Sequence, residues 1–123
     1  MFMFISNDDY QLIEQSIYLP LVLTILHKDK QLIEQAPFKI KEPYLHIIEN
    51  ALTKVENDLY QLKIKLKQNQ ITITKKGTNE AFSLYEFNIK GQTQDHSFYH
   101  PVMKNKTAEL LEGYLKDGTI LTS

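Results

Sequence analysis

The chain contains no cysteine and no arginine among its 123 residues. Without cysteine there can be no disulfide scaffold, no thiolate zinc site and no cysteine nucleophile. All fourteen basic residues are lysine, so the bidentate guanidinium pairing with carboxylate, phosphate or guanine is excluded, as is an arginine finger. Lysine can still contact phosphate as a point charge.

Long apolar runs and a charge excess are also lacking. The longest apolar run, "IYLPLVLTIL", is too short to span a bilayer. The first residues, "MFMFI", lack the basic segment of a signal peptide, so we expect a cytoplasmic location. A net charge of -1 gives no overall attraction to nucleic acid or to a membrane surface. We expect one domain, residues 1–123, because this length normally forms one core.

Catalytic and cofactor motifs are missing as well. The sequence has no GxSxG, no phosphate-binding P-loop and no GxGxxG, so we predict no cofactor. An enzyme would need a composite site formed by residues distant in the sequence. His96 and His100 are four residues apart and could bridge a metal if both lay on one strand, but further ligands at a matching spacing are missing. We therefore predict no metal site and interpret them as surface histidines beside a turn.

A helical pattern runs from Asn7 to about Gln35 and contains Pro20. The preceding "SNDD" supplies a capping residue and early acidic residues. A proline at this place either kinks one helix or begins a second. We predict a kinked or broken pair, Asp8–Leu19 and Pro20–Gln35.

The next predicted helix, from Pro43 to about Asn69, carries a heptad seam. Its apolar residues alternate at spacings of three and four over three repeats, which is typical of a helix that packs along one stripe. The seam consists of Leu45, Ile48, Leu52, Val55, Leu59, Leu62 and Leu66. The earlier helices of the same chain or a second chain could cover it, and the pattern leaves both open.

Charge along this helix predicts an orientation for any dimer formed through the seam. Glu49, Glu56 and Asp58 lie in its first part, and Lys63, Lys65 and Lys67 lie in its last part. An antiparallel pair sets acidic residues against basic ones at both ends, whereas a parallel pair sets like charges together. We therefore expect a homodimer, two-fold symmetric and antiparallel if it uses this helix.

The remaining pattern predicts strands and a closing helix. "QITITK" alternates as a strand, "KGTNEA" is a loop, and "FSLYEFNIK" is a second strand with Tyr85, Phe87 and Ile89 on one face. "GQTQD" is a turn, "HSFYH" a short third strand, and Lys104 to Lys116 the last helix. The predicted fold class is α+β and mostly helical, with an antiparallel meander of two or three strands.

The order of three helices and a hairpin also suggests a winged helix that binds nucleic acid. In that alternative Lys63, Lys65, Lys75 and Lys76 would contact phosphate. Against it, the long helix is apolar where groove contacts would lie, and the chain lacks a strongly basic patch. We expect no tight binding to duplex DNA near physiological salt.

Three segments carry a family resemblance: "YLPLVLTIL", "FKIKEPYLHIIENALTKVENDL" and "ELLEGYL". From about Asp8 to Leu115 the chain resembles the YhjD-like proteins, small uncharacterised proteins of low-GC Gram-positive bacteria. The resemblance implies a cytoplasmic bacterial protein and no known activity or functional residue. The function is therefore unknown. Our leading hypothesis is a non-catalytic interaction or regulatory protein that self-associates, with a nucleic-acid binder and a composite-site enzyme as alternatives.

Overall fold

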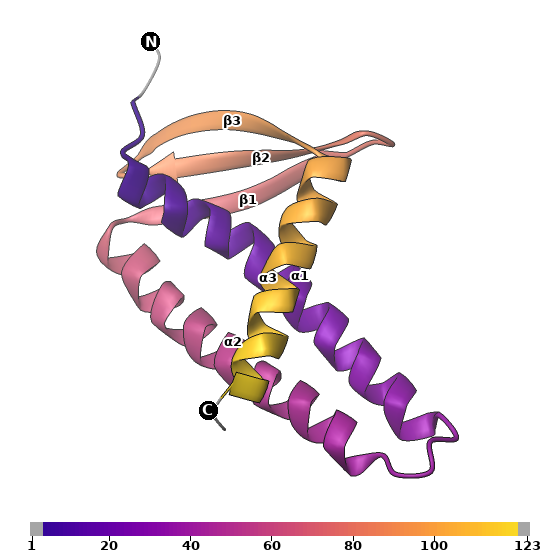
Figure 1. Cartoon of the computed structure of the whole chain (residues 1–123). Coiled ribbons are helices and arrows are strands. Elements are labelled where there is room, and N and C mark those ends of the chain that lie inside the picture. Colours follow the sequence, from indigo (N-terminus) through magenta and orange to yellow (C-terminus); the bar gives the residue numbers. More distant parts are fainter. Residues whose placement is uncertain (1–3, 121–123) are drawn as a thin grey trace.

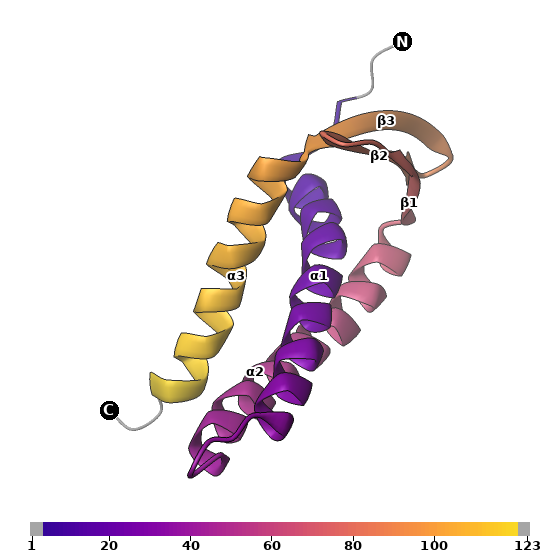
Figure 2. The ribbon, with the colours of Figure 1, turned by 90° about the vertical axis from the view of Figure 1, so that its right-hand side faces the viewer.

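Three helices and one antiparallel sheet make up the part of the chain that the computed structural model describes, the backbone of residues 4–120 and the side chains of residues 4–116. The elements are α1 (Asn7–Gln35), α2 (Glu42–Gln68), β1 (Ile71–Thr78), β2 (Phe82–Ile89), β3 (Gln92–Tyr99) and α3 (His100–Ile120). The sheet, in the order β1-β2-β3, lies across one end of the helices (Figures 1 and 2). The predicted α+β, mostly helical class is confirmed.

The first helix is continuous, which corrects the predicted pair Asp8–Leu19 and Pro20–Gln35. It begins at the Ser6 cap, whose Oγ accepts a hydrogen bond of 3.1 Å from the backbone N–H of Asp9. Pro20 lies inside the helix and is exposed. The backbone carbonyl four residues earlier, which a proline leaves without its usual donor, therefore lies on the solvent side of the helix.

Burial on both sides of Pro20 explains why α1 does not break. Ile13 and Ile17 precede the proline and pack beneath the sheet, whereas Val22 and Leu26 follow it and pack against α2. A break at Pro20 would expose one of these groups, and each buried aliphatic side chain contributes about 1.5–3 kcal/mol. The burial on the two sides together outweighs a proline penalty of about 3 kcal/mol.

The second helix runs back toward the sheet beside α1 (Figure 1). It starts at Glu42, one residue before the predicted start at Pro43. Pro43 lies in the first turn, where a proline loses no hydrogen bond. The Nζ of Lys41 donates to the carbonyl oxygen of Glu34 at 2.5 Å. This contact places a positive charge at the carboxyl end of α1, where the helix dipole favours it.

The meander confirms the predicted strand pairing and alternation. Tyr85, Phe87 and Ile89 on β2 face the helices, opposite Lys75, Ile73 and Ile71 of β1. The third strand is longer than "HSFYH", because the turn before it has only two residues, Lys90 and Gly91. Both have positive φ, 53° and 88°, as a type I′ turn requires. This turn fits the twist of the strands and allows pairing from Ile89 onward.

The hairpin of β1 and β2 contains a bulge at Lys76. Lys75 pairs with Tyr85 and Gly77 with Leu84, so Lys76 is the extra residue on β1. The connecting loop is therefore only Asn79–Ala81, shorter than the predicted "KGTNEA". The Oδ1 of Asn79 closes it by accepting hydrogen bonds from the backbone N–H groups of Ala81 and Phe82 at 2.9 and 2.8 Å.

The last helix starts at His100, directly after β3, and not at Lys104 as predicted. Pro101 lies in its first turn, where the missing N–H costs nothing. Both α1 and α3 run away from the sheet (Figures 1 and 2). The observed order, two helices, three strands and one helix, differs from the winged-helix order. No helix in the described residues has an apolar stretch long enough to cross a membrane.

Two hydrophobic clusters form the core of the described part of the chain. The sheet cluster joins the first half of α1 to the strands and to Met103, and it consists of Ile13, Ile17, Tyr18, Ile71, Phe87, Ile89, Phe98 and Met103. The helical cluster joins the second half of α1 to α2, and it consists of Val22, Leu26, Ile48, Ala51, Leu52 and Val55. Leu110 of α3 packs against both clusters.

We predict that Leu52→Ala lowers the free energy of unfolding by about 2–5 kcal/mol, because it leaves a cavity in the helical cluster. Leu52 is 6% exposed. Leu59, expected from the seam to be equally buried, is only partly buried, so Leu59→Ala should cost less. Ile64→Ala, at a position on α2 that is 39% exposed, is the control. Urea denaturation of the three variants measures the loss in the free energy of unfolding, which should be largest for Leu52→Ala and smallest for Ile64→Ala. Equal midpoints for Leu52→Ala and Ile64→Ala would contradict the prediction.

Candidate functional site

The predicted interaction seam of α2 is covered within the chain. Ile48, Leu52, Val55 and Leu62 are buried, and Leu45, Leu59 and Leu66 are partly buried. The helical cluster is filled from α1 by Val22 and Leu26 and from α3 by Leu111, Tyr114 and Leu115. A second chain is thus not needed to cover the seam. Self-association stays a prediction, and so does the part of the seam in it.

The four lysines proposed for phosphate contact do not share one surface. Lys63 and Lys65 lie on the exposed side of α2. Lys75 faces the helices, whereas Lys76 extends from the bulge to the outer face of the sheet. The Nζ of Lys76 lies 3.8 Å from an oxygen of Glu86 and 3.4 Å from an oxygen of Asp95, which neutralise its charge.

The two histidines lie in different surroundings. His96 lies on β3 and stacks on Phe87, with ring centroids 4.4 Å apart and planes 14° apart. His100, the first residue of α3, bonds instead to the β1–β2 hairpin. Among residues 4–116, no group of three or more His, Cys, Asp or Glu side chains lies close enough to hold a metal ion.

An apolar groove of 520 Å³ lies between α1, α3 and the sheet, and we call it the α1–α3 groove. Its volume falls within the range of about 300–1,000 Å³ typical of small-molecule sites. Its apolar and aromatic side chains come from α1, β2 and α3: Leu21, Ile25, Tyr85, Met103, Ala108 and Leu111. Its polar side chains are Thr24, Lys75, Ser83, His100, Lys104 and Thr107, and none of the acidic side chains within residues 4–116 lines it.

A polar cluster closes the sheet end of this groove. The Nδ1 of His100 lies 3.2 Å from the carbonyl oxygen of Glu80, which can only accept a hydrogen bond. The neutral ring therefore carries its proton on Nδ1, and Nε2 accepts from the Oγ of Ser83 at 2.9 Å. The Oγ1 of Thr78 lies 3.2 Å from the same Ser83 oxygen. A serine, a base and a group that orients the base are thus assembled.

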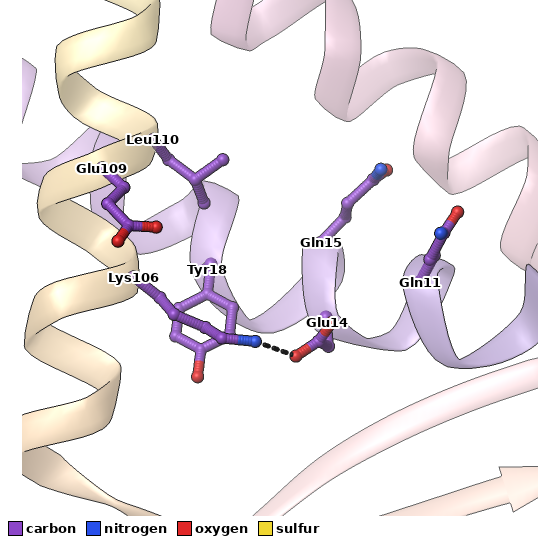
Figure 3. A pocket seen from close by; sticks show the side chains of 7 residues that line it. All are labelled: Gln11, Glu14, Gln15, Tyr18, Lys106, Glu109 and Leu110. Atoms are coloured by element: carbon purple, nitrogen blue, oxygen red, sulfur yellow. Dashed lines mark hydrogen bonds and ion pairs between the residues drawn. The ribbon is translucent and has the colours of Figure 1, made fainter. Parts of the chain in front are cut away.

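A second depression, of 320 Å³, uses other faces of α1 and α3 (Figure 3). Lys106 donates a hydrogen bond of 2.6 Å to Glu14 and lies 5.9 Å from the centroid of the Tyr18 ring. The hydrogen bond to Glu14 raises the pKa of Lys106, and burial raises the pKa of Tyr18. The central charges pair with each other, so this depression is better explained as a contact that joins the two helices.

The fold and the groove define the class: a small α+β protein whose sheet caps its helices, with an apolar groove between α1, α3 and the sheet. The sequence is more specific. It matches the YhjD protein family over residues 4–119, and the chain belongs to that family. The predicted resemblance to YhjD-like proteins is confirmed.

A relative from Bacillus aligns with most of the chain. The chain is 33% identical over 111 residues to the uncharacterised protein YhjD of Bacillus subtilis (strain 168), and the alignment covers 90% of this chain and 92% of the relative. No solved structure matches the chain. The relatives therefore confirm a family of unknown function, and the groove has to be interpreted from its own chemistry.

Sequence reasoning did not find the α1–α3 groove. Its residues come from α1, β1, β2 and α3, and no local spacing connects them. One signal was available on β2, where alternation puts Ser83 on the same face as Tyr85 and Phe87. A small polar residue on an otherwise apolar strand face indicates either a hydrogen-bond partner or a cavity beside it.

We predict that His96 makes the fold sensitive to acid. Burial lowers the pKa of His96, and the charge of Asp95 only partly opposes this. The unfolded chain, with a histidine pKa near 6.5, then binds protons more readily than the folded chain. The contribution of neutral His96 to the free energy of unfolding is therefore fully present above about pH 6.5. It is lost as the pH falls through the lower pKa that His96 has in the folded chain.

Thermal unfolding between about pH 7 and pH 5 tests this prediction. His96→Phe should reduce the acid-dependent fall in the melting temperature. The buried Nε2 of His96 has no hydrogen-bond partner within the described part of the chain, and a phenyl ring can replace the stack on Phe87. His46→Phe, at an exposed position on α2, is the control and should keep the wild-type fall. An unchanged fall in His96→Phe would show that other groups cause it.

Proposed function

We propose that this chain is a non-catalytic interaction or regulatory protein of the cytoplasm that self-associates through an apolar surface at the turn between α1 and α2. This surface, the tip patch, consists of Leu32, Phe38, Ile40 and Tyr44, all exposed. The rings of Phe38 and Tyr44 are 5.1 Å apart. Exposed apolar side chains that gather in one place are typical of protein–protein contacts. The contact of Phe38 with Tyr44, with Leu32 and Ile40 exposed beside the same turn, is the observation that carries the proposal.

A second copy of the chain is the partner that the charges around the tip patch favour. Residues 28–42 contain four lysines and three acidic residues, so two patches can meet without strong repulsion. A mixed patch of this kind has no preference for an anionic membrane or nucleic acid. Two copies of one patch form an isologous contact with two-fold symmetry. The patch is small, so the dimer should be weak and depend on concentration.

Self-association is tested by sedimentation velocity over a series of protein concentrations. The average sedimentation coefficient should rise with concentration for the wild type, and Ile40→Asp should abolish the rise by burying a charge in the contact. Tyr60→Asp is the matched control, because Tyr60 is 65% exposed and Ile40 63% exposed, and Tyr60 lies on α2 outside the patch. A wild type that stays monomeric, or an equal effect of both variants, would refute the proposal.

The cytoplasmic location is part of the same proposal. A chain without cysteine forms no disulfides, and this fits a reducing compartment such as the cytoplasm. Nucleic-acid binding has less support, because Lys75 and Lys76 point to opposite faces of β1 and Lys76 is paired with Glu86 and Asp95. A clustered basic patch is the expected footprint of a nucleic-acid binder.

The enzyme alternative has one observation in its favour, the hydrogen bond between Ser83 and His100. In an acyl transfer, Ser83 Oγ would attack an ester carbonyl carbon while its proton passes to His100 Nε2 and then to the leaving alcohol; water would hydrolyse the acyl-serine. Against this role, Ser83 is only 4% exposed, and its hydroxyl also lies within hydrogen-bond distance of Thr78. These contacts serve equally well to attach the hairpin to α3.

A fluorophosphonate probe separates the two interpretations. It forms a bond from serine oxygen to phosphorus and releases fluoride only when a base activates the serine. We expect no labelling of the wild type, detected as an unchanged intact mass, because the Ser83 hydroxyl is buried. Labelling of Ser83 that disappears in His100→Gln, with Ser97→Ala as a labelled control from the exposed side of β3, would establish the enzyme alternative.

A further inference from the structure

The α1–α3 groove carries two lysines whose charges are not neutralised by the chain. Lys75 comes from β1 and Lys104 from α3, and both line the groove. Within residues 4–116 neither forms an ion pair or a side-chain hydrogen bond, and no acidic side chain lines the groove with them. Elsewhere lysines do find acidic partners, as Lys106 does in Glu14 and Lys76 in Asp95. The groove is therefore an apolar surface with an unopposed positive charge.

Polarity changes along the groove from the sheet outward. Ser83 and His100 lie at the sheet end, and Lys104 is one turn of α3 beyond His100. The amino terminus of α3 adds the positive end of its helix dipole at this place. Because α1 and α3 both run away from the sheet (Figure 2), Ile25 and Leu111 lie toward the other end. A cationic end and an apolar end fit a ligand with an anionic head and a hydrocarbon chain.

We propose that the α1–α3 groove binds a monocarboxylate with an unbranched hydrocarbon chain, of the fatty-acid class. The carboxylate lies between Lys75 and Lys104, and the chain lies along Leu21, Met103, Ala108 and Leu111. Each lysine is a point charge that can contact one oxygen of a carboxylate, and the apolar lining beyond them suits a hydrocarbon chain. The groove is built from residues outside the tip patch, so this proposal is independent of self-association.

The ligand is tested by isothermal titration calorimetry of the full chain with dodecanoate below its micelle concentration. We expect saturable binding at one site. Dodecanol keeps the chain and lacks the charge, and butanoate keeps the charge and lacks most of the chain, so both should bind at least about tenfold more weakly. Dodecanol that binds as tightly as dodecanoate would overturn the role of the lysines.

Variants locate the site. Lys75→Gln and Lys104→Gln should each weaken dodecanoate binding about tenfold, since each removes one charged contact. Ala108→Phe should block the groove, and thermal melting shows whether this variant still folds. Lys63→Gln, an exposed lysine on α2 outside the groove, is the control and should bind as the wild type does. Equal affinities for Lys75→Gln, Lys104→Gln and Lys63→Gln would refute the assignment.

Two further outcomes are decisive. Binding to anionic phospholipid vesicles without binding to monomeric dodecanoate would mean that a membrane surface, and not the groove, takes the anion, and the proposal would fail. The Ile40→Asp variant should bind dodecanoate as the wild type does, because Ile40 is outside the groove. Loss of binding in this variant would instead tie the groove to the self-associated form and contradict its independence.

Discussion

The whole arrangement depends on α1 remaining helical across Pro20. The residues before this proline belong to the sheet cluster and the residues after it to the helical cluster, so one helix connects two cores. α2 and α3 then pack on α1 and on each other, and the sheet lies across its first half. The α1–α3 groove follows from the same geometry, because Leu21 and Ile25 lie just beyond the proline on the side that faces α3.

The sequence could predict the parts of the fold in which apolar residues recur at a regular spacing along the chain. Alternation on β2 and the three-four spacing on α2 identified both elements to within a residue or two, since each pattern reports directly which face is buried. Pro20 was misjudged because the local rule sees only the lost hydrogen bond and not the burial on its two sides. The start of α3 was placed too late because "HSFYHP" reads as strand and turn, although His100 already belongs to the helix.

The candidate site could hardly be predicted at all. Ser83 and His100 are seventeen residues apart, and they meet only because β3 leads directly into α3 beside the hairpin. Lys75 shows the same limit: it is adjacent in sequence to Lys76, but strand geometry and the bulge give the two lysines opposite surroundings, and only Lys75 lines the groove. The heptad seam shows a different limit. Its apolar stripe could pack equally well on helices of the same chain or on a helix of a second chain, so the sequence does not show which one covers it.

The bulge at Lys76 has a consequence for how copies of this chain can accumulate. β1 and β3 are the two edges of the sheet, and an unprotected edge can template the addition of further strands. An extra residue and a lysine on an edge strand obstruct such pairing. With β1 protected, strand addition is left to β3 alone, and β3 against β3 joins only two molecules. A continuous ribbon of sheet edges needs both edges free, so strand addition through β3 stops at two molecules.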